Sequence, residues 1–288
     1  MIRVVMLGRT GNNLFQYALG RVLAERHGVP LVLDASWFNA QGWGQVKCLQ
    51  CLPGPAAGTA RIVRRCSLGA RALLKATRKH YWEYRRVPVL RESESDQSFD
   101  PRFHAAPAEC MLFGYFQTPR YFQGFETTLR DELATRDLGL EQGREELARQ
   151  LRNPGSVAVH VRRTDYVGNP DLDLCGIAYY RAAMQRMRDT VSAARFFVFS
   201  DAPAWCQQHI TGRDVAVVEH RASQSSLADL HLMSLAHHHI IANSSYSWWA
   251  AWLGEKPGQQ VLMPARWFGT IEAPIEEKRC QGWEVVEC

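Results

Sequence analysis

The chain has 288 residues, of which 46% are hydrophobic and 22% are charged, and its formal net charge is +5. A chain of this length can bury a sizeable core and predicts one large or two modest domains. No run approaches the roughly 20 apolar residues of a membrane-spanning helix, and residues 1–13 lack the long apolar stretch of a signal peptide. We therefore expect a cytoplasmic protein.

Strands and helices follow one another in the first half of the chain. We expect strands at 3–7, 29–34 and 110–116, and helices from Asn12 onward and at 119–134. The stretch "GRTGNN" (8–13) is a strand-to-helix turn that resembles a phosphate loop, although it is neither G-x-G-x-x-G nor a Walker A loop. Residues 38–58 are rich in Gly, Gln, Cys and Pro and indicate a loop.

A basic segment covers residues 61–86, which hold nine Lys and Arg residues against one acid, Glu83. Such a segment is typical of a solvated amphipathic helix. A second hypothesis is that it contacts an anionic membrane, at the inner face of which the protein would then lie. Its aromatic residues do not interleave with the charges, which disfavours nucleic-acid binding.

The second half alternates apolar strands with helices. We expect strands at 156–161, 196–200, 215–219, 239–243 and 261–264, and helices at 178–191, 226–236 and 246–253. This alternation predicts a Rossmann-like domain with a parallel sheet covered on both faces. "RNPGS" before it indicates a boundary, giving domains 1–152 and 153–288. Two α/β domains that face a cleft would bind a ligand at the carboxyl ends of the strands.

The most informative stretch is "VAVHVRRTDY" (157–166). Because alternate residues of a strand share a face, His160 and Arg162 should point one way, and Val161 and Arg163 the other. Arginine forks at the end of a strand suit a phosphate group. A salt-bridged cap of the sheet, with Asp165 as the partner, explains the same residues equally well.

Two further strand ends carry polar residues. In "IIANSSYSWW" (240–249), Asn243, Ser244, Ser245 and Ser247 crowd the start of a helix, which indicates an anion site. Simple N-capping explains one of these residues. In "FFVFSDAPAW" (196–205), Asp201 can accept from a ribose hydroxyl or a guanine edge, or cap the next helix. The tryptophans at 248, 249 and 252 fit a helix core.

We expect no metal site from the cysteines or histidines. The single C-x-x-C, Cys48 and Cys51, lacks the second pair or the histidines that a zinc site needs. The eight cysteines are typical of free thiols in a chain of this kind. The histidines at 237–239 are interpreted as surface and packing positions.

Taken in order, these motifs resemble the family 11 glycosyltransferases, the α-1,2-fucosyltransferases. That family reads G-G-L-G-N-Q-[ML]-F-Q-Y-A, H-V-R-R-G-D-Y, F-S-D-D and I-I-A-N-S-S-F-S-W-W. The matches here are Gly8, Gly11 and Asn12 with "FQYA" (15–18), then "HVRRTDY" (160–166), "FSD" (199–201) and "IIANSSYSWW" (240–249). Asn13 stands for the family's Gln. Thr164 stands for the family's Gly, Ala202 for its second Asp and Tyr246 for its Phe.

The resemblance implies a GT-B-like fold and transfer of L-fucose from GDP-β-L-fucose, with inversion, to a galactose-containing glycan. The arginine would neutralise the diphosphate, so that no metal and no cofactor are required. Arg162, His160 and Asp165 are the implied catalytic residues, with Asp165 as the base. The implied donor-binding residues are Gly11, Asn12, Arg163, Asp201, Asn243, Ser244, Ser245 and Ser247. Alternatives are another nucleotide sugar, or a non-catalytic nucleotide- or glycan-binding protein.

Overall fold

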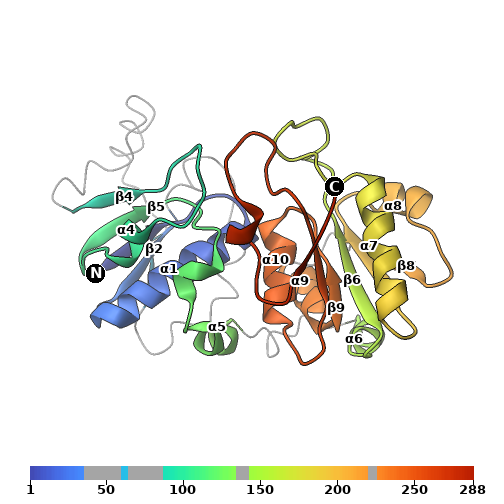
Figure 1. Cartoon of the computed structure of the whole chain (residues 1–288). Helices are drawn as coiled ribbons and strands as arrows, with labels where there is room; N and C mark the ends of the chain where they lie inside the picture. Colours follow the sequence, from blue (N-terminus) through green and yellow to red (C-terminus); the bar gives the residue numbers. More distant parts are fainter. Residues whose placement is uncertain (36–59, 64–86, 134–142, 220–225) are drawn as a thin grey trace. The chain divides into compact units, whose positions relative to one another are not determined.

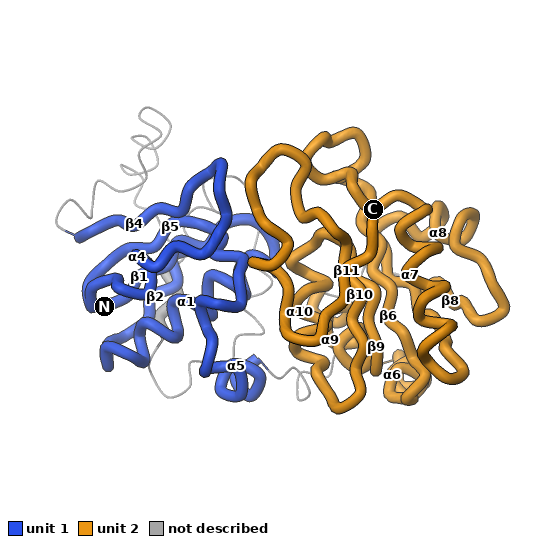
Figure 2. Tube along the Cα trace, in the orientation of Figure 1, with its two compact units in different colours: residues 1–133 blue, residues 134–288 orange. Residues whose placement is uncertain are grey.

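The computed structural model describes residues 1–35, 87–133, 143–219 and 226–288, and the backbone of 60–63. The chain divides into two compact units, 1–133 and 134–288 (Figure 2). The sequence places the boundary later, between 152 and 153. In the structure α6 (Glu145–Leu151) belongs to the second unit, where it packs against α9 (Ser226–Leu235).

Unit 1 is built on a five-stranded sheet with the order β3-β2-β1-β5-β4, in which every pairing is parallel. Short aliphatic runs form its central strands, which are buried on both faces. Its strands are β1 (Ile2–Val5), β2 (Leu31–Asp34), β3 (Ala60–Val63), β4 (Val89–Arg91) and β5 (Cys110–Phe113). Its helices are α1 (Thr10–His27), α4 (Pro101–His104), the 3-10 helix η4 (Pro119–Phe122) and α5 (Glu126–Glu132).

Helix α1 connects β1 to β2 and confirms the predicted helix, beginning two residues before Asn12. It ends at Gly28, whose φ of 61° is in the left-handed region. The Gly28 N–H donates to the carbonyls of Ala24 and Glu25, which closes the last turn. Glycine adopts this backbone without the penalty of a Cβ atom.

Unit 2 holds a six-stranded parallel sheet with the order β11-β10-β9-β6-β7-β8. Its strands are β6 (Ser156–Val161), β7 (Arg195–Ser200), β8 (Val215–Val217), β9 (His238–Ile240), β10 (Val261–Pro264) and β11 (Glu284–Val286). Besides α6 and α9, its helices are α7 (Ile177–Thr190), α8 (Pro203–His209), α10 (Ser245–Leu253) and η5 (Ile275–Glu277). Helices α7 and α8 lie on one side of the sheet, and α9 and α10 lie on the other (Figure 1). The predicted parallel α/β domain is thereby confirmed.

Some element ends differ from the sequence expectation. Residues 61–63 belong to strand β3 and do not begin a helix, while 64–86 and 38–58 lie outside the described residues. The strand expected at 110–116 stops at Phe113, and the left-handed φ of 55° at Phe116 excludes that residue from a strand. The strand expected at 239–243 stops at Ile240. Strands β4 and β11, three residues each, were not predicted.

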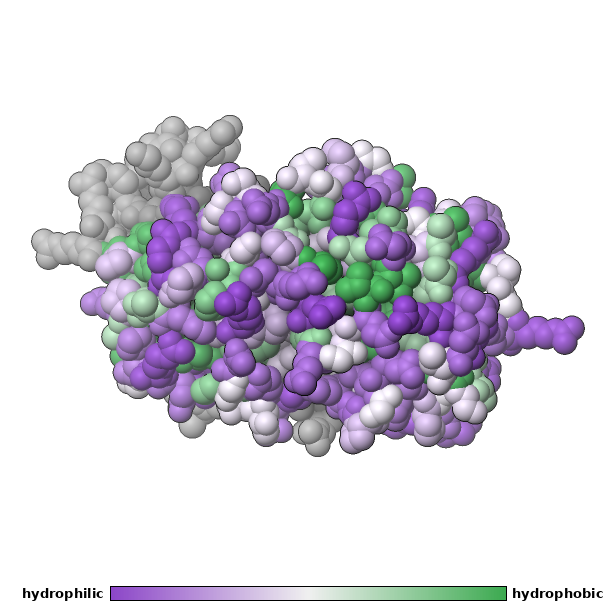
Figure 3. Space-filling model, in the orientation of Figure 1, coloured by the Kyte–Doolittle hydropathy of each residue, from purple (hydrophilic) through white to green (hydrophobic). Residues whose placement is uncertain are grey.

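Within the described ranges, no helix is both long and apolar enough to cross a membrane. The face of the molecule in Figure 3 is mostly hydrophilic, with small hydrophobic areas between the polar side chains. The apolar residues of the sequence are instead buried around the two sheets.

Candidate active site

The strand order of unit 2 identifies the place where a ligand is expected. Counted from β6, the order β8-β7-β6-β9-β10-β11 is 3-2-1-4-5-6, the arrangement of dinucleotide-binding folds. The chain adds β7 and β8 on one side of β6 and then crosses to β9 on the other. In such sheets the ligand crevice lies at this switch point, outside the carboxyl ends of the strands. The two main polar motifs follow β6 and β9.

The residues at the end of β6 alternate between the two faces as the sequence predicts. Val161 packs into the apolar cluster that contains Cys206 of α8. Arg163 continues on that side, with its guanidinium over the Trp205 ring of α8. The His160 ring instead lies 5.5 Å from the ring of Tyr246, in α10. The side chains of Arg162 and Arg163 therefore point to opposite faces of the sheet.

His160 is a buried, neutral imidazole. Only 6% of the residue is exposed, and burial together with the nearby Arg162 charge lowers its pKa to about 4. Its Nδ1 atom has no hydrogen-bond partner in the part of the chain that the structure describes. At neutral pH one nitrogen of this uncharged ring can donate a hydrogen bond and the other can accept one.

Arg162 is held by two carboxylates. Its Nε donates to Asp165 Oδ1 at 2.7 Å, and its Nη1 lies 3.1 Å from Asp201 Oδ2. The guanidinium carbon also lies 5.7 Å from the centre of the Tyr166 ring. Burial opposes the charge of Arg162, but the Asp165 hydrogen bond and the two negative charges outweigh it and raise its pKa. The predicted pairing with Asp165 is present, and it leaves the Nη2 edge of the fork without a hydrogen bond to any described residue.

Asp201 fixes the start of the loop that follows β6. Its Oδ1 accepts the Arg163 N–H at 2.9 Å, and its Oδ2 accepts the N–H and the hydroxyl of Thr164 at 3.3 and 2.6 Å. The side chain thereby joins the tips of β6 and β7. Thr164, which departs from the family motif, supplies the hydroxyl of this arrangement. The predicted contact between Asp201 and a nucleoside stays a prediction.

Arg163 differs from Arg162 in its surroundings. Its guanidinium carbon lies 4.0 Å from the centre of the Trp205 ring, and this ring stacks on His209 at 4.5 Å. No carboxylate among the described residues forms an ion pair with Arg163. The Arg163 guanidinium is held by the Trp205 ring and not by a carboxylate, so its positive charge can still bind an anionic group.

The turn between β9 and α10 is polar but compact. Asn243, Ser244 and Ser247 are buried, with 3%, 7% and 1% exposure, and Ser245 is the first residue of α10. The Ser247 hydroxyl donates to the Ser244 carbonyl at 3.2 Å, so its polarity is satisfied inside the helix. Ser244 is the N-cap, but its side chain makes no capping hydrogen bond. The donor-binding role of these serines stays a prediction.

The tryptophans of α10 form helix core, as the sequence predicts. Trp248 and Trp249 have no exposed surface, and Trp252 stacks on Trp248 at 6.1 Å. The Trp248 indole N–H donates to the Lys278 carbonyl at 2.7 Å. The rings thus anchor α10 and are not a surface platform for a sugar.

The glycine turn of unit 1 precedes α1. Gly8 has a φ of 69°, and a Cβ atom at this position would lie 2.3 Å from Asn12 Nδ2. Gly11 is buried in the first turn of α1, and the Asn12 Oδ1 accepts from Gln117 at 3.0 Å. The first strand, β1, lies between β2 and β5, so this turn follows the switch point of its own sheet.

Sequence reasoning did not single out Glu92, which follows β4. Its carboxylate accepts the N–H groups of Tyr115 and Phe116 at 2.6 and 3.0 Å and holds the left-handed Phe116 in place. A glutamate in the polar run "ESES" (92–95) gives no signal of this role.

Asp229 in α9 was also missed. It pairs with the buried Arg144 at 2.6 Å, and its charge raises the pKa of His160 against the larger effects of burial and Arg162. Its place in the run "DLHLMS", which matches the family, was the available signal.

The expectation of a metal-free site assumed that the chain has no Asp-x-Asp pair of carboxylates, and this was wrong, because Asp171 and Asp173 form one. Asp171 Oδ1 accepts the Thr270 N–H at 2.8 Å, and Asp173 Oδ2 accepts the Gly168 N–H at 3.0 Å. Both carboxylates therefore order loops. Among the described residues, no group of three or more His, Cys, Asp and Glu side chains could hold a metal ion.

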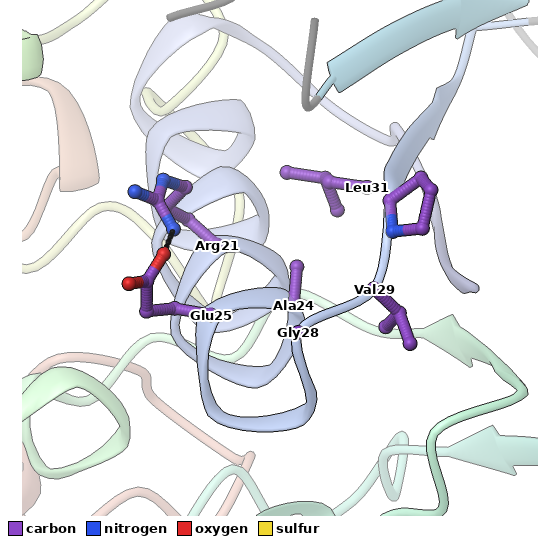
Figure 4. Close-up of a pocket in the computed structure, with 7 residues that line it drawn as sticks. Arg21, Ala24, Glu25, Gly28, Val29 and Leu31 are labelled. Carbon is purple, nitrogen blue, oxygen red and sulfur yellow. Dashed lines mark hydrogen bonds and ion pairs between the residues drawn. The ribbon is translucent and has the colours of Figure 1, made fainter. Parts of the chain in front are cut away.

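A cavity of about 340 Å³ in unit 1 is lined by none of these residues (Figure 4). It lies at the last turns of α1 and the first residue of β2, Leu31, at the amino end of that strand. Its only charged side chains, Arg21 and Glu25, pair with each other. A ligand site at the carboxyl ends of the strands would lie elsewhere.

Within unit 2 the structure brings together His160, Arg162, Asp165 and Asp201 at the end of β6. Asn243 joins them through its carbonyl, which accepts the Tyr166 hydroxyl at 3.2 Å. Gly11 and Asn12 belong to unit 1. Chemically, the cluster offers a preorganised cation, a neutral imidazole and an exposed carboxylate, which suit the departure of an anionic leaving group.

Three characterised proteins illustrate the sequence similarity. The chain is 36% identical over 185 residues to an alpha-1,2-colitosyltransferase of Escherichia coli, covering 61% of this chain and 62% of the relative. It is 33% identical to the O-antigen biosynthesis glycosyltransferase WbnK of Escherichia coli, over 40% of each chain. It is 28% identical to galactoside alpha-(1,2)-fucosyltransferase 2 of Mus musculus, over 86% of this chain and 66% of the relative. In each case, the match spans less than two thirds of the relative.

Solved structures show the same fold at low identity. NodZ alpha-1,6-fucosyltransferase, co-crystallised with GDP, matches with a TM-score of 0.51 and 16% identity over 87% of this chain and 91% of its own. A variant of Arabidopsis thaliana FUT1 in complex with GDP matches with a TM-score of 0.51 and 12% identity, over 91% of this chain and 69% of its own. These neighbours are GT-B fucosyltransferases, and the model of glycosyl transferase family 11 matches residues 92–284. The chain therefore has the GT-B fold and belongs to glycosyl transferase family 11.

Proposed function

We propose that this chain transfers L-fucose from GDP-β-L-fucose, with inversion, to a hydroxyl of an oligosaccharide or a surface-polysaccharide precursor, with galactose O2 as the acceptor atom. The observation that carries the proposal is Arg162, held by two carboxylates at the switch point of unit 2. Membership of family 11 and the fucosyltransferases among the relatives support it.

In the proposed reaction the acceptor oxygen attacks C1 of the sugar while the bond from C1 to the β-phosphate oxygen breaks on the opposite face. Negative charge then grows on the departing GDP. The Nη2 edge of Arg162 would donate to a phosphate oxygen, and the fixed positions of Nε and Nη1 spare the reorganisation that a free side chain needs.

Asp165 would accept the proton of the acceptor hydroxyl. Its side chain is 39% exposed, so an acceptor could reach it. The neutral His160 would lie beside the departing diphosphate. We further propose that the reaction needs no divalent cation and takes place in the cytoplasm.

A second candidate donor is the GDP form of colitose, which lacks the 3-hydroxyl of L-fucose. The similarity to the colitosyltransferase favours it. A site that hydrogen-bonds the 3-hydroxyl would reject the analogue without it by a large factor, whereas an apolar lining would discriminate little.

One assay separates these possibilities. Release of GDP is measured with each donor, with and without a panel of galactose-terminated glycans, and NMR identifies the linkage and anomeric configuration of the product. Acceptor-dependent release with GDP-fucose as the better donor supports the proposal. Preference for the colitose donor replaces it with the second candidate. Binding of GDP without turnover of either donor would contradict both.

A further inference from the structure

The side chain of Asn243 makes its hydrogen bonds within the protein. Its Nδ2 donates to the carbonyls of Leu172 and Trp267 at 3.0 and 3.2 Å. Its Oδ1 accepts from the Cys175 thiol at 3.4 Å. An asparagine amide has two N–H groups, and both are occupied here in a residue that is 3% exposed. No amide proton remains for the nucleotide sugar that the sequence motif suggested.

These contacts join two segments that are far apart in the sequence. Leu172 belongs to the loop 166–174, which leads from β6 to α7, and Trp267 belongs to the segment 265–270 after β10. The same two segments also meet directly, where the Gly269 N–H donates to the Asp171 carbonyl at 3.0 Å. A Cβ atom on Gly269 would lie 2.0 Å from the Pro170 carbonyl oxygen, so the two backbones touch.

The carbonyl of Asn243 extends this network to the arginine. It accepts the Tyr166 hydroxyl at 3.2 Å, and the Tyr166 ring lies beside the Arg162 guanidinium. Asp165, the other partner of Arg162, immediately precedes Tyr166 in the same loop. Displacement of this loop would therefore move the Tyr166 ring and the Asp165 carboxylate, both of which hold Arg162 in place.

We propose that Asn243 is a positioning residue: it fastens the loop 166–174 and the segment 265–270 to the end of β9, and thereby sets the geometry of Arg162. It does so without touching the donor. The effect on nucleotide binding rests on the proposed function, in which Arg162 binds the diphosphate.

The test combines two measurements on the full chain. Hydrogen exchange of 166–174 and 265–270 is followed without ligand, and the Kd of GDP is measured by calorimetry for wild type, Asn243→Ala, Arg162→Lys and the double variant. We expect Asn243→Ala to speed exchange in both segments and to weaken GDP about tenfold. In the Arg162→Lys background, the same change should weaken GDP less than about twofold, because coupled residues are not additive.

Asn153→Ala is the matched control. Asn153 Nδ2 also donates to two main-chain carbonyls, those of Arg149 and Gln150, but at the amino end of β6. This variant should leave both measurements at the wild-type values. Equal weakening of GDP in both backgrounds would instead mean that Asn243 contacts the ligand, and the proposal would be overturned. Unchanged exchange in both segments would overturn it as well.

Two milder variants keep the test decisive if Asn243→Ala does not fold. Thr270→Val removes the hydroxyl that donates to Asp171, and Tyr166→Phe removes the hydroxyl that donates to the Asn243 carbonyl. Each should speed exchange in 166–174 and weaken GDP about threefold, in line with the loss of one hydrogen bond. Wild-type exchange and affinity in both would refute the proposal. If wild type itself binds no GDP, the proposed function fails, while the exchange data still decide the role of Asn243.

Discussion

The guanidinium carbon of Arg163 lies over the Trp205 ring, 4.0 Å from its centre, on the opposite side of the second sheet from His160. The backbone N–H of the same arginine is fixed by Asp201. A cation held in this way is oriented before any anion arrives. The half-buried Trp205, in turn, packs against the apolar cluster beneath α7 and α8.

We predict that Trp205→Leu raises the KM for the nucleotide-sugar donor by about threefold to tenfold, because a cation–π contact of this type contributes roughly 0.5–2 kcal/mol. Trp205→Phe keeps an aromatic face and should stay within about twofold of wild type. Initial rates over a range of donor concentrations give both numbers. If the two variants share one KM, the ring does not orient Arg163.

Arg162→Lys should lower kcat by about a hundredfold or more. Lysine keeps the charge but cannot bind Asp165, Asp201 and a phosphate oxygen through one planar fork, and preorganised charge of this kind is worth about 3 kcal/mol. Thermal unfolding of the variant controls for loss of structure. Near-normal turnover by a folded variant would show that the leaving group is stabilised elsewhere.

The buried histidines predict how stability depends on pH. The pKa of His160 falls from 6.5 to about 4 in the folded chain, and that of His239 to about 3, chiefly through burial. Each histidine binds its proton more readily when unfolded. Stability is therefore present above pH 6.5 and is lost as the pH falls toward 4.

Urea unfolding at stepped pH values between 6.5 and 4 measures this effect. His160→Gln should lose stability less steeply across this range than wild type, because glutamine does not titrate. An unchanged slope would mean that His160 binds its proton equally well in the folded and unfolded chain, and would contradict the lowered pKa. His239→Gln provides an independent comparison.

Activity should survive an excess of EDTA to within about twofold, since arginines at the leaving group can replace a divalent cation. The two aspartates with metal-binding spacing, Asp171 and Asp173, bind loop N–H groups instead. A metal-dependent transferase assayed in the same buffer confirms that chelation is complete. A strict requirement for Mg²⁺ or Mn²⁺ would contradict the arginine mechanism.

The fold of unit 2 could be predicted well because its strands are apolar runs bounded by polar turns. Strand β6 and strand β10 occupy the predicted residues. The strands that were missed, β4 and β11, have three residues each and no fully buried member, so they leave no hydrophobic pattern. Their pairing with β5 and β10 arises only in the assembled sheets.

The sequence predicted which residues gather at the candidate site, but not which of them bind one another. Alternation along β6 correctly separates His160 and Arg162 from Arg163. Sequence could not reveal that Asp201 would bind the Thr164 hydroxyl, or that the amide of Asn243 would be occupied by Leu172 and Trp267. Those contacts depend on where loops distant in sequence meet, and local patterns carry no information about that.

The strand order also sets the time at which the site can form during synthesis. Strand β6 pairs with β9, and Val157 lies opposite His238 in that pairing. All of β7, β8 and their helices are made before β9 exists, so the growing chain can build only the half-sheet β6-β7-β8. Contacts between such distant residues form slowly because a long loop must close first. The arginine motif (160–166) and the serine motif (243–247) therefore meet only at a late step of folding. A chain that ends before β9 has the arginines but lacks the turn that carries the serines.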